Sequence, residues 1–172
     1  MKHFFLLAVL ALAACKEEVA QVPDPIPLTD TALSHFCQMN VSEHGGPKAQ
    51  IHLEDYLAPI FFAQVRDAVA YLKSPERDAR VLAVYVSDMG AAVSWSKPGI
   101  HNWINAEETL FVVGAPVAGG MGAPEIVPFA SREKAEAFRL KYGGLIFAFK
   151  DIPDNAALGA VDTEIRLEEP IW

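Results

Sequence analysis

The sequence predicts an α+β fold made of two similar ββαβ units in tandem, placed after a signal peptide and a proline-rich tether. Two helical patterns of apolar residues occur along the chain, and each is followed by an apolar run typical of a strand. A Gly-Gly pair precedes each helical pattern, in a loop between two apolar runs. The same order of elements therefore occurs twice.

Composition excludes two classes of protein. Of the 172 residues, 52% are hydrophobic, which is enough for a domain with a core. Acidic residues number 22 against 14 lysines and arginines, and the formal net charge is −8. We therefore expect no nucleic-acid partner, because binding to phosphates requires a basic face. The longest apolar run, Phe4–Ala14, has 11 residues, whereas a helix that spans a membrane needs roughly 20. We therefore expect no membrane-spanning protein.

Residues 1–14 have the features of a lipoprotein signal peptide: a short basic head, an apolar body and small residues at its end. The segment Leu12-Ala13-Ala14-Cys15 resembles the bacterial lipobox, which predicts that Cys15 carries the lipid and becomes the first mature residue. Lys16 follows, where an Asp would signal retention in the inner membrane. We therefore expect a periplasmic protein anchored in the outer membrane. The alternative is an ordinary signal peptide that happens to contain a cysteine.

Residues 15–34 are expected to form the lipidated tether, since Pro23, Pro25 and Pro27 favour an extended chain. The first unit, residues 35–92, is expected to hold the metal site. Its predicted elements are a hairpin of residues 36–41 and 48–53 around the loop 42–47, a helix over 57–72 with Pro59 in its first turn, and a strand over 80–86.

The second unit, residues 93–172, repeats this order. Its predicted elements are a strand over 109–113, a loop rich in Gly and Pro over 114–124, a strand over 125–129, a helix from the N-cap Ser131 to Tyr142, and a strand over 145–149. Gly45-Gly46 and Gly119-Gly120 occupy comparable places in the two units. One continuous α+β domain is the alternative to a duplicated unit.

Cys37 is the one thiol left free if Cys15 is acylated. Cys37 and Met39 would project from one face of the predicted strand, because residues two apart share a face. His44 lies in the loop just beyond. Thiolate, thioether and imidazole form a soft donor set that favours Cu(I) over Zn²⁺. A strand that faces a core would also carry Cys and Met at alternate positions, so the spacing alone leaves packing open.

Three further side chains are weaker candidates for the copper site. His35 shares the strand face of Cys37 only if the strand extends back that far. Met89 and Met121 lie in loops beside glycines, where a methionine is a ligand, a docking contact or a core residue.

Several blocks of the sequence resemble those of one known family. The two most telling are Cys37-Gln38-Met39, which leads into His44-Gly45-Gly46-Pro47-Lys48, and Gly119-Gly120-Met121-Gly122-Ala123-Pro124-Glu125. Shorter blocks occur between and beside them in the same order: Val65-Arg66-Asp67, Tyr85 to Gly90, Ser94-Trp95, Pro98-Gly99, Asn102 to Ile104, and Val112 to Gly114. From these blocks the chain is identified as a member of the NosL family, the accessory lipoproteins of nitrous oxide reductase.

This resemblance implies a lipid-anchored periplasmic copper chaperone. It would deliver Cu(I) to a membrane ABC-type complex that matures nitrous oxide reductase and its copper-sulfur cluster. The family fold is two ββαβ units, similar to organomercurial lyase. The family's metal motif falls on Cys37 and Met39, and His44 is the best candidate for the imidazole. Two other classes remain: a thiol-dependent enzyme of organomercurial-lyase-like fold, and a passive interaction lipoprotein of the envelope. We expect no enzyme, since no second free Cys or Ser/His/Asp order stands out.

Overall fold

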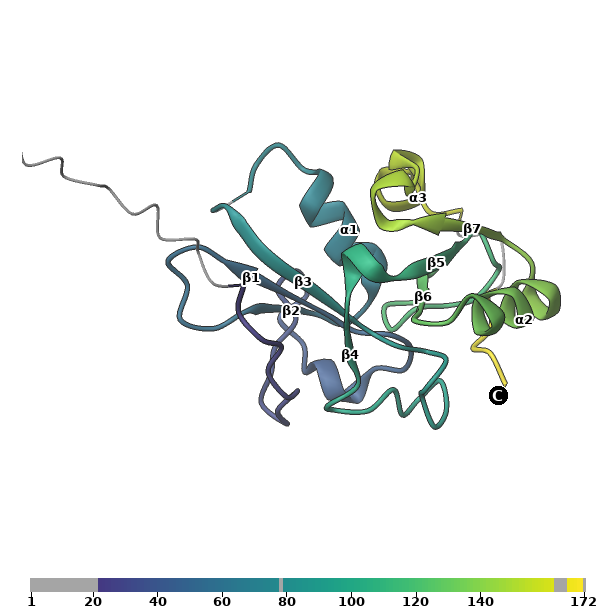
Figure 1. Ribbon diagram of the computed structural model, residues 1–172, viewed down its shortest axis with the longest axis horizontal. Coiled ribbons are helices and arrows are strands. Elements are labelled where there is room, and N and C mark those ends of the chain that lie inside the picture. The colour runs from purple at the N-terminus through teal and green to yellow at the C-terminus, as the bar shows by residue number, and fades with distance from the viewer. Residues whose placement is uncertain (1–21, 78, 163–166, 172) are drawn as a thin grey trace, which may run out of the picture.

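The computed structural model describes residues 22–77, 79–162 and 167–171. These residues form two antiparallel sheets with helices packed against them (Figure 1). None of the described helices is long and apolar enough to cross a membrane. The residues expected to form the signal peptide, and Cys15 with them, lie outside the described part of the chain.

The first sheet has four strands in the order β2-β1-β3-β4. Its bounds are Ala49–Leu53 for β1, Ile60–Phe62 for β2, Val81–Ser87 for β3 and Trp103–Asn105 for β4. Helix α1, Val65–Lys73, connects β2 to β3. It ends before Pro75, because proline disfavours helical backbone in the residue that precedes it. The order β1-β2-α1-β3 along the chain is a ββαβ unit.

The second sheet repeats this arrangement with three strands in the order β6-β5-β7. Its bounds are Leu110–Val113 for β5, Val127–Phe129 for β6 and Leu145–Ala148 for β7, and α2, Arg132–Tyr142, connects β6 to β7. Gly143 and Gly144 follow α2 with φ of 84° and 90°, the left-handed backbone that glycine adopts most readily. In both units the first strand of the chain lies at the centre, and the predicted tandem ββαβ fold is confirmed.

Two predicted elements of the first unit were wrong. Residues 36–41 form a turn and the start of the short 3₁₀ helix η1, Val41–Glu43, so β1 pairs with β2 instead. The predicted helix over 57–72 begins only at Val65, because Ile60–Phe62 is strand β2. Phe61 matches a helical repeat as well as a strand, and a short apolar run does not distinguish the two. In the second unit, the strand expected over 125–129 begins at Val127.

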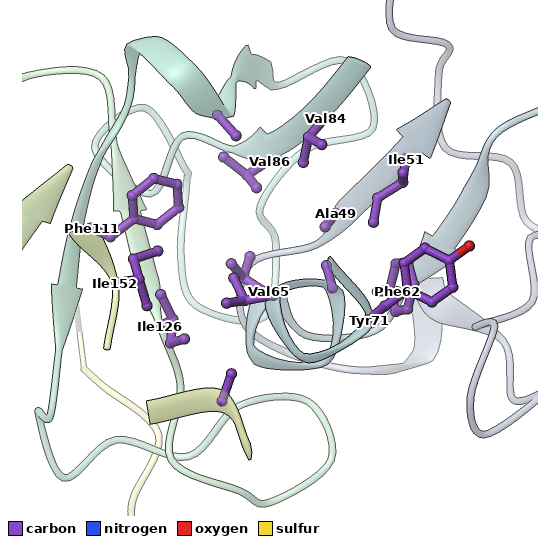
Figure 2. Packing of buried hydrophobic residues seen from close by; sticks show 14 of the residues in the cluster. Ala49, Ile51, Phe62, Val65, Tyr71, Val84, Val86, Phe111, Ile126 and Ile152 are labelled. Atoms are coloured by element: carbon purple, nitrogen blue, oxygen red, sulfur yellow. The ribbon is translucent and has the colours of Figure 1, made fainter. Parts of the chain in front are cut away.

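The largest core cluster takes residues from both units. Figure 2 shows Val65 of α1 between two groups: Phe111 of β5, Ile126 and Ile152 at the left, and Ala49 and Ile51 of β1 at the right. Two short helices follow β7 in the described part of the chain: η3, Phe149–Asp151, and α3, Asp154–Leu158, which packs against α1. A further 3₁₀ helix, η2, Ala106–Glu108, links β4 to β5. The two units therefore share one hydrophobic core.

Part of the expected tether lies on the first sheet. The side chain of Gln50 in β1 pairs with both backbone groups of Ile26, at 2.9 Å each. The hydroxyl of Tyr85 in β3 donates to the carbonyl of Pro23 at 2.8 Å. Leu28 is buried, in a small cluster with Phe61 of β2. Residues 23–28 are therefore held against the body by backbone hydrogen bonds and packing.

Candidate metal site

Cys37 lies in a tight turn and not on a strand. The amide of Ser34 donates to the carbonyl of Met39 at 2.9 Å, and the amide of Gln38 donates back to the carbonyl of Ser34 at 2.8 Å. Gln38 has a φ of 57° and its side-chain amide donates to the carbonyl of His35 at 2.8 Å, which holds this left-handed residue in place. The expectation that Cys37 and Met39 share a strand face is wrong. We call residues 34–39 the cysteine turn.

The sulfur-bearing residues of the cysteine turn are accessible. Cys37 is a free, partly exposed thiol. Met39 is 47% exposed, and the neighbouring Phe36 is 51% exposed. Both soft donors can therefore be reached by an ion or by a partner's ligands.

His35 belongs to the same turn but its ring packs in an aromatic cluster. The ring contacts Phe36, Phe62 and Tyr71, with the Tyr71 ring edge-on at a centroid distance of 5.3 Å. The backbone amide of His35 donates to the carbonyl of Phe61 at 2.7 Å, which attaches the cysteine turn to β2. In this structure His35 supports the turn through packing.

His44 follows η1 and is held in one tautomer. Its Nδ1 lies 2.8 Å from the carbonyl oxygen of Gly120. A carbonyl only accepts, so Nδ1 carries the proton and Nε2 of the neutral ring carries the free lone pair. Nε2 is buried and has no hydrogen-bond partner among the described residues. An imidazole oriented by a backbone carbonyl in this way is typical of a metal ligand.

Residues 118–124, which we call the glycine loop, contain both Gly120, which contacts His44, and Met121, which follows it in the chain. The loop is closed by hydrogen bonds from Gly119 N to the carbonyl of Ala123 and from Gly122 N to that of Gly119. Met121 follows the residue that binds His44, its amide donates to Oε1 of Gln64 at 3.1 Å, and its side chain is 38% exposed. His44 therefore contacts the loop that carries Met121, through the carbonyl of Gly120. No hydrogen bond or ring contact of the described residues joins His44 to the cysteine turn.

Met89 is a buried core residue. It is 2% exposed, belongs to the second core cluster with Phe129 and Phe138, and lines a pocket of about 300 Å³ beside α2. Among the described residues there is also no group of three His, Cys, Asp or Glu that could hold a metal.

Two buried charged residues that the sequence reasoning did not single out, Lys48 and Glu125, lie near the contact between the first unit and the glycine loop. Lys48 is 1% exposed and donates to the carbonyls of Gly45 and Ala63 at 2.7 and 3.0 Å. Burial lowers the pKa of Lys48 to about 8, against the opposing effect of Glu125 and Glu169. The sequence did contain a sign of their similar places: Lys48 ends the segment Gly45-Gly46-Pro47-Lys48, and Glu125 ends the segment Gly122-Ala123-Pro124-Glu125.

Glu125 joins the glycine loop to the start of α1. Its Oε1 accepts from the amides of Arg66 and Ile126 at 3.0 and 2.8 Å, whereas Oε2 is buried with no hydrogen-bond partner in the described part of the chain. Burial raises the pKa of Glu125 to about 8, although both amides favour the ionised form. Glu125 thus supplies an acceptor at the N-terminus of α1 from the other unit.

The two motifs that carried the resemblance meet at Gly120. A Cβ at this residue would lie 2.6 Å from the carbonyl oxygen of Ala63 and 2.9 Å from that of Gly45. Only glycine allows the backbone to approach so closely. The segment His44–Lys48 and the glycine loop are therefore in direct contact, although they are far apart in the sequence.

Comparison with known proteins agrees with these motifs. A model of the NosL family matches residues 25–157. The chain is 53% identical over 163 residues to the copper-binding lipoprotein NosL of Achromobacter cycloclastes, covering 92% of this chain and 84% of that protein. It is 34% identical over 158 residues to the copper-binding lipoprotein NosL of Stutzerimonas stutzeri, covering 89% and 80%.

Solved structures show the same likeness. The crystal structure of the copper chaperone NosL from Shewanella denitrificans matches with a TM-score of 0.70 and 34% identity, covering 75% of this chain and 95% of that one. The solution structure of apo-NosL from Achromobacter cycloclastes matches with a TM-score of 0.50 and 53% identity, covering 67% and 92%. Sequence motifs, fold and relatives agree, and the chain belongs to the NosL family.

Proposed function

We propose that this protein is a lipid-anchored periplasmic metallochaperone that binds Cu(I) and delivers it for the maturation of nitrous oxide reductase. The observation that carries the proposal is the accessible pair of sulfur donors, Cys37 and Met39, on one short turn. Thiolate and thioether prefer Cu(I) among the metals of the cell. The relatives named copper-binding lipoproteins and a copper chaperone support the same choice.

The geometry suits transfer better than storage. Copper moves between proteins by ligand exchange, which requires that an incoming ligand reach the ion. Cys37 and Met39 are open to solvent, and Leu33 and Phe36 beside them are 52% and 51% exposed. Exposed apolar side chains around a metal-binding turn provide a contact surface for an acceptor protein. The proposed acceptor is the ABC-type maturation complex and, through it, nitrous oxide reductase.

A Cu(I) titration of the apo-protein against a competing chelator, under anaerobic conditions, tests the metal site. We expect one Cu(I) per chain in the unsubstituted protein and a loss of affinity of about 100-fold or more in Cys37→Ser, because an alcohol is a poor ligand for a soft cation. Ser94→Ala, at a residue remote in sequence from the turn, is the control and should bind as the parent does. Equal affinity in Cys37→Ser would exclude Cys37 as the principal ligand.

Delivery requires a separate experiment. The Cu(I)-loaded chain is mixed with the purified maturation complex, and copper on each protein is measured after their separation. We expect the complex to gain copper faster from the Cu(I)-loaded chain than from a Cu(I)-chelator complex at the same copper concentration. Turnover of an organometallic substrate by the chain would instead favour the thiol-dependent enzyme.

A further inference from the structure

The described chain enters the body at one particular end of the first sheet. Leu28 N donates to the carbonyl of Ile100, in the connection that follows β3, whereas Ile26 pairs with Gln50 in the middle of β1. Pro23 accepts from Tyr85, whose ring lies edge-on to His52 near the end of β1. Residues 23–26 therefore lie on the face of the first sheet formed by Gln50, His52 and Tyr85, where Gln50 and Tyr85 are cross-strand partners. Figure 1 shows the β1–β2 loop and the start of the described chain at the left of the body.

The distance available to a lipid anchor is short. Val22 is seven residues after Cys15, and seven fully extended residues span at most about 25 Å. A free tether up to Asp30 would reach roughly twice as far. A folded chain of this size is about 40 Å across. An anchor at Cys15 therefore keeps the β1–β2 end of the body close to the bilayer.

The β1–β2 loop, residues 54–59, presents apolar side chains at this end. Leu57 is 108% exposed and Tyr56 is 48% exposed, while Val22 at the start of the described chain is 58% exposed. A leucine as exposed as Leu57 makes almost no contact within its own chain. Leucine and tyrosine are also the kinds of side chain that enter the boundary between headgroups and acyl chains.

We propose that the β1–β2 loop rests on the surface of a lipid bilayer, with Tyr56 and Leu57 as its contacts. The inference depends on the acylation of Cys15 in the proposed function. The anchor makes the contact intramolecular, so two apolar side chains suffice where they would not hold a free protein. The contact fixes which face of the body points away from the membrane.

The charges of the loop favour an apolar contact over an electrostatic one. Glu54 is paired with Arg80 at 2.7 Å, and Asp55 beside it is exposed. Attraction to acidic lipids would require a surplus of Lys and Arg at this surface. The proposed contact should therefore persist at high salt, unlike the binding of a basic patch.

Hydrogen exchange of the full-length chain measures the contact. The acylated protein is inserted into vesicles of phosphatidylethanolamine and phosphatidylglycerol, and the Cys15→Ser chain is mixed with the same vesicles. We expect amides of residues 54–58 to exchange at least about threefold more slowly in the anchored chain, in low salt and in 0.5 M NaCl alike. Leu57→Glu should abolish this difference, and it should not unfold the protein, because Leu57 is fully exposed.

Leu140→Glu is the matched control, because Leu140 is a 76% exposed leucine on α2 of the second unit. It should leave the protection of the loop unchanged. Equal exchange in the anchored and soluble chains, protection that survives in Leu57→Glu, or protection only in native membranes that contain proteins would each overturn the inference. Flotation of the vesicles and Cu(I) titration of the same samples separate the causes. A chain that floats and lacks loop protection but binds copper contradicts this inference alone, whereas loop protection without copper binding contradicts the metal site alone.

Discussion

His44 can offer a metal only one of its two ring nitrogens, because the carbonyl of Gly120 occupies Nδ1. Cys37 and Met39 differ from His44 in two respects: their donors are sulfur, and Cys37 is partly exposed and Met39 is exposed. The three side chains are thus not equivalent. Two soft donors lie on a turn at the surface, and one oriented imidazole lies in the contact between the two units.

The difference between the donors predicts how each substitution changes metal preference. Met39→Ala should weaken Cu(I) binding about tenfold while it changes Zn²⁺ binding little, because a neutral thioether contributes mainly to soft cations. His44→Ala should weaken both metals. Competition titrations with a Cu(I) chelator and with Zn²⁺ measure the two affinities. Leu33→Ala, at another exposed apolar residue close to the turn, is the control, and equal losses of both metals in Met39→Ala would mean that Met39 is no ligand.

Glu125 predicts a pH dependence of stability. Its pKa is raised to about 8 in the folded state from an ordinary 4.5, mainly by burial. Between these two pH values the folded protein retains a proton that the unfolded chain has lost, so the free energy of unfolding falls as pH rises. Glu125→Gln removes this titration. Urea unfolding of both proteins from pH 5 to 7.5 should show the parent losing stability relative to Glu125→Gln, by at most about 1.4 kcal/mol per pH unit.

Lys48 titrates in a higher pH range in the parent protein, where Glu125 raises its pKa against the effect of burial. Burial lowers its pKa to about 8 in the folded state from 10.5, so its effect lies above pH 8, where rising pH favours the folded protein. A stability difference between parent and Glu125→Gln that stays constant from pH 5 to 7.5 would show that Glu125 is ionised in the folded protein.

At the scale of elements, the glycine loop packs so closely on the first unit that Gly120 leaves no room for a side chain. Gly120→Ala should lower the free energy of unfolding by about 1–3 kcal/mol, because its Cβ would overlap the carbonyl oxygens of Ala63 and Gly45. Gly122→Ala is the matched control in the same loop. Gly122 has a φ of 78° and open space around it, so alanine there costs only the left-handed backbone, about 1 kcal/mol. Urea unfolding compares them, and equal costs would mean that the loop can move away from the first unit.

The elements also show where prediction from sequence succeeds. The helix from Ser131 to Tyr142 and the strands after both helices were predicted well, because their apolar repeat is regular and Gly or Pro marks their ends. The segment 36–41 was predicted as a strand and is a turn. Its conformation depends on Gln38 in a left-handed backbone and on the hydrogen bond of His35 to β2, which no local pattern records.

The candidate site was predictable only in part for the same reason. Cys37 and Met39 were chosen by the chemistry of their side chains, which the sequence states directly. The tautomer of His44 depends on its contact with the carbonyl of Gly120, which is 76 residues away in the sequence. The buried charges of Lys48 and Glu125 are likewise defined by packing between the units.

At the scale of the whole molecule, a single substitution should abolish the proposed attachment to the membrane. Cys15→Ser should move the protein from the membrane fraction to the soluble fraction, because each methylene of an acyl chain contributes about 0.8 kcal/mol to membrane binding. Fractionation of cells and immunoblotting measure this. A substitution of Cys37 instead, which leaves Cys15 in place, is the control and should remain with the membrane. Membrane retention of the Cys15→Ser protein would mean that the anchor lies elsewhere.

The core that the two units share also determines when the chain can fold during its synthesis. Its largest cluster begins at Ala49 and includes Ile152 and Ala157, so it cannot close until nearly the whole described chain is present. A polypeptide threaded through a secretion channel from its N-terminus would emerge with its central interface still unfinished. Premature folding on the wrong side of the membrane would compete with export, and a core that needs both early and late residues delays that competition until synthesis is almost over.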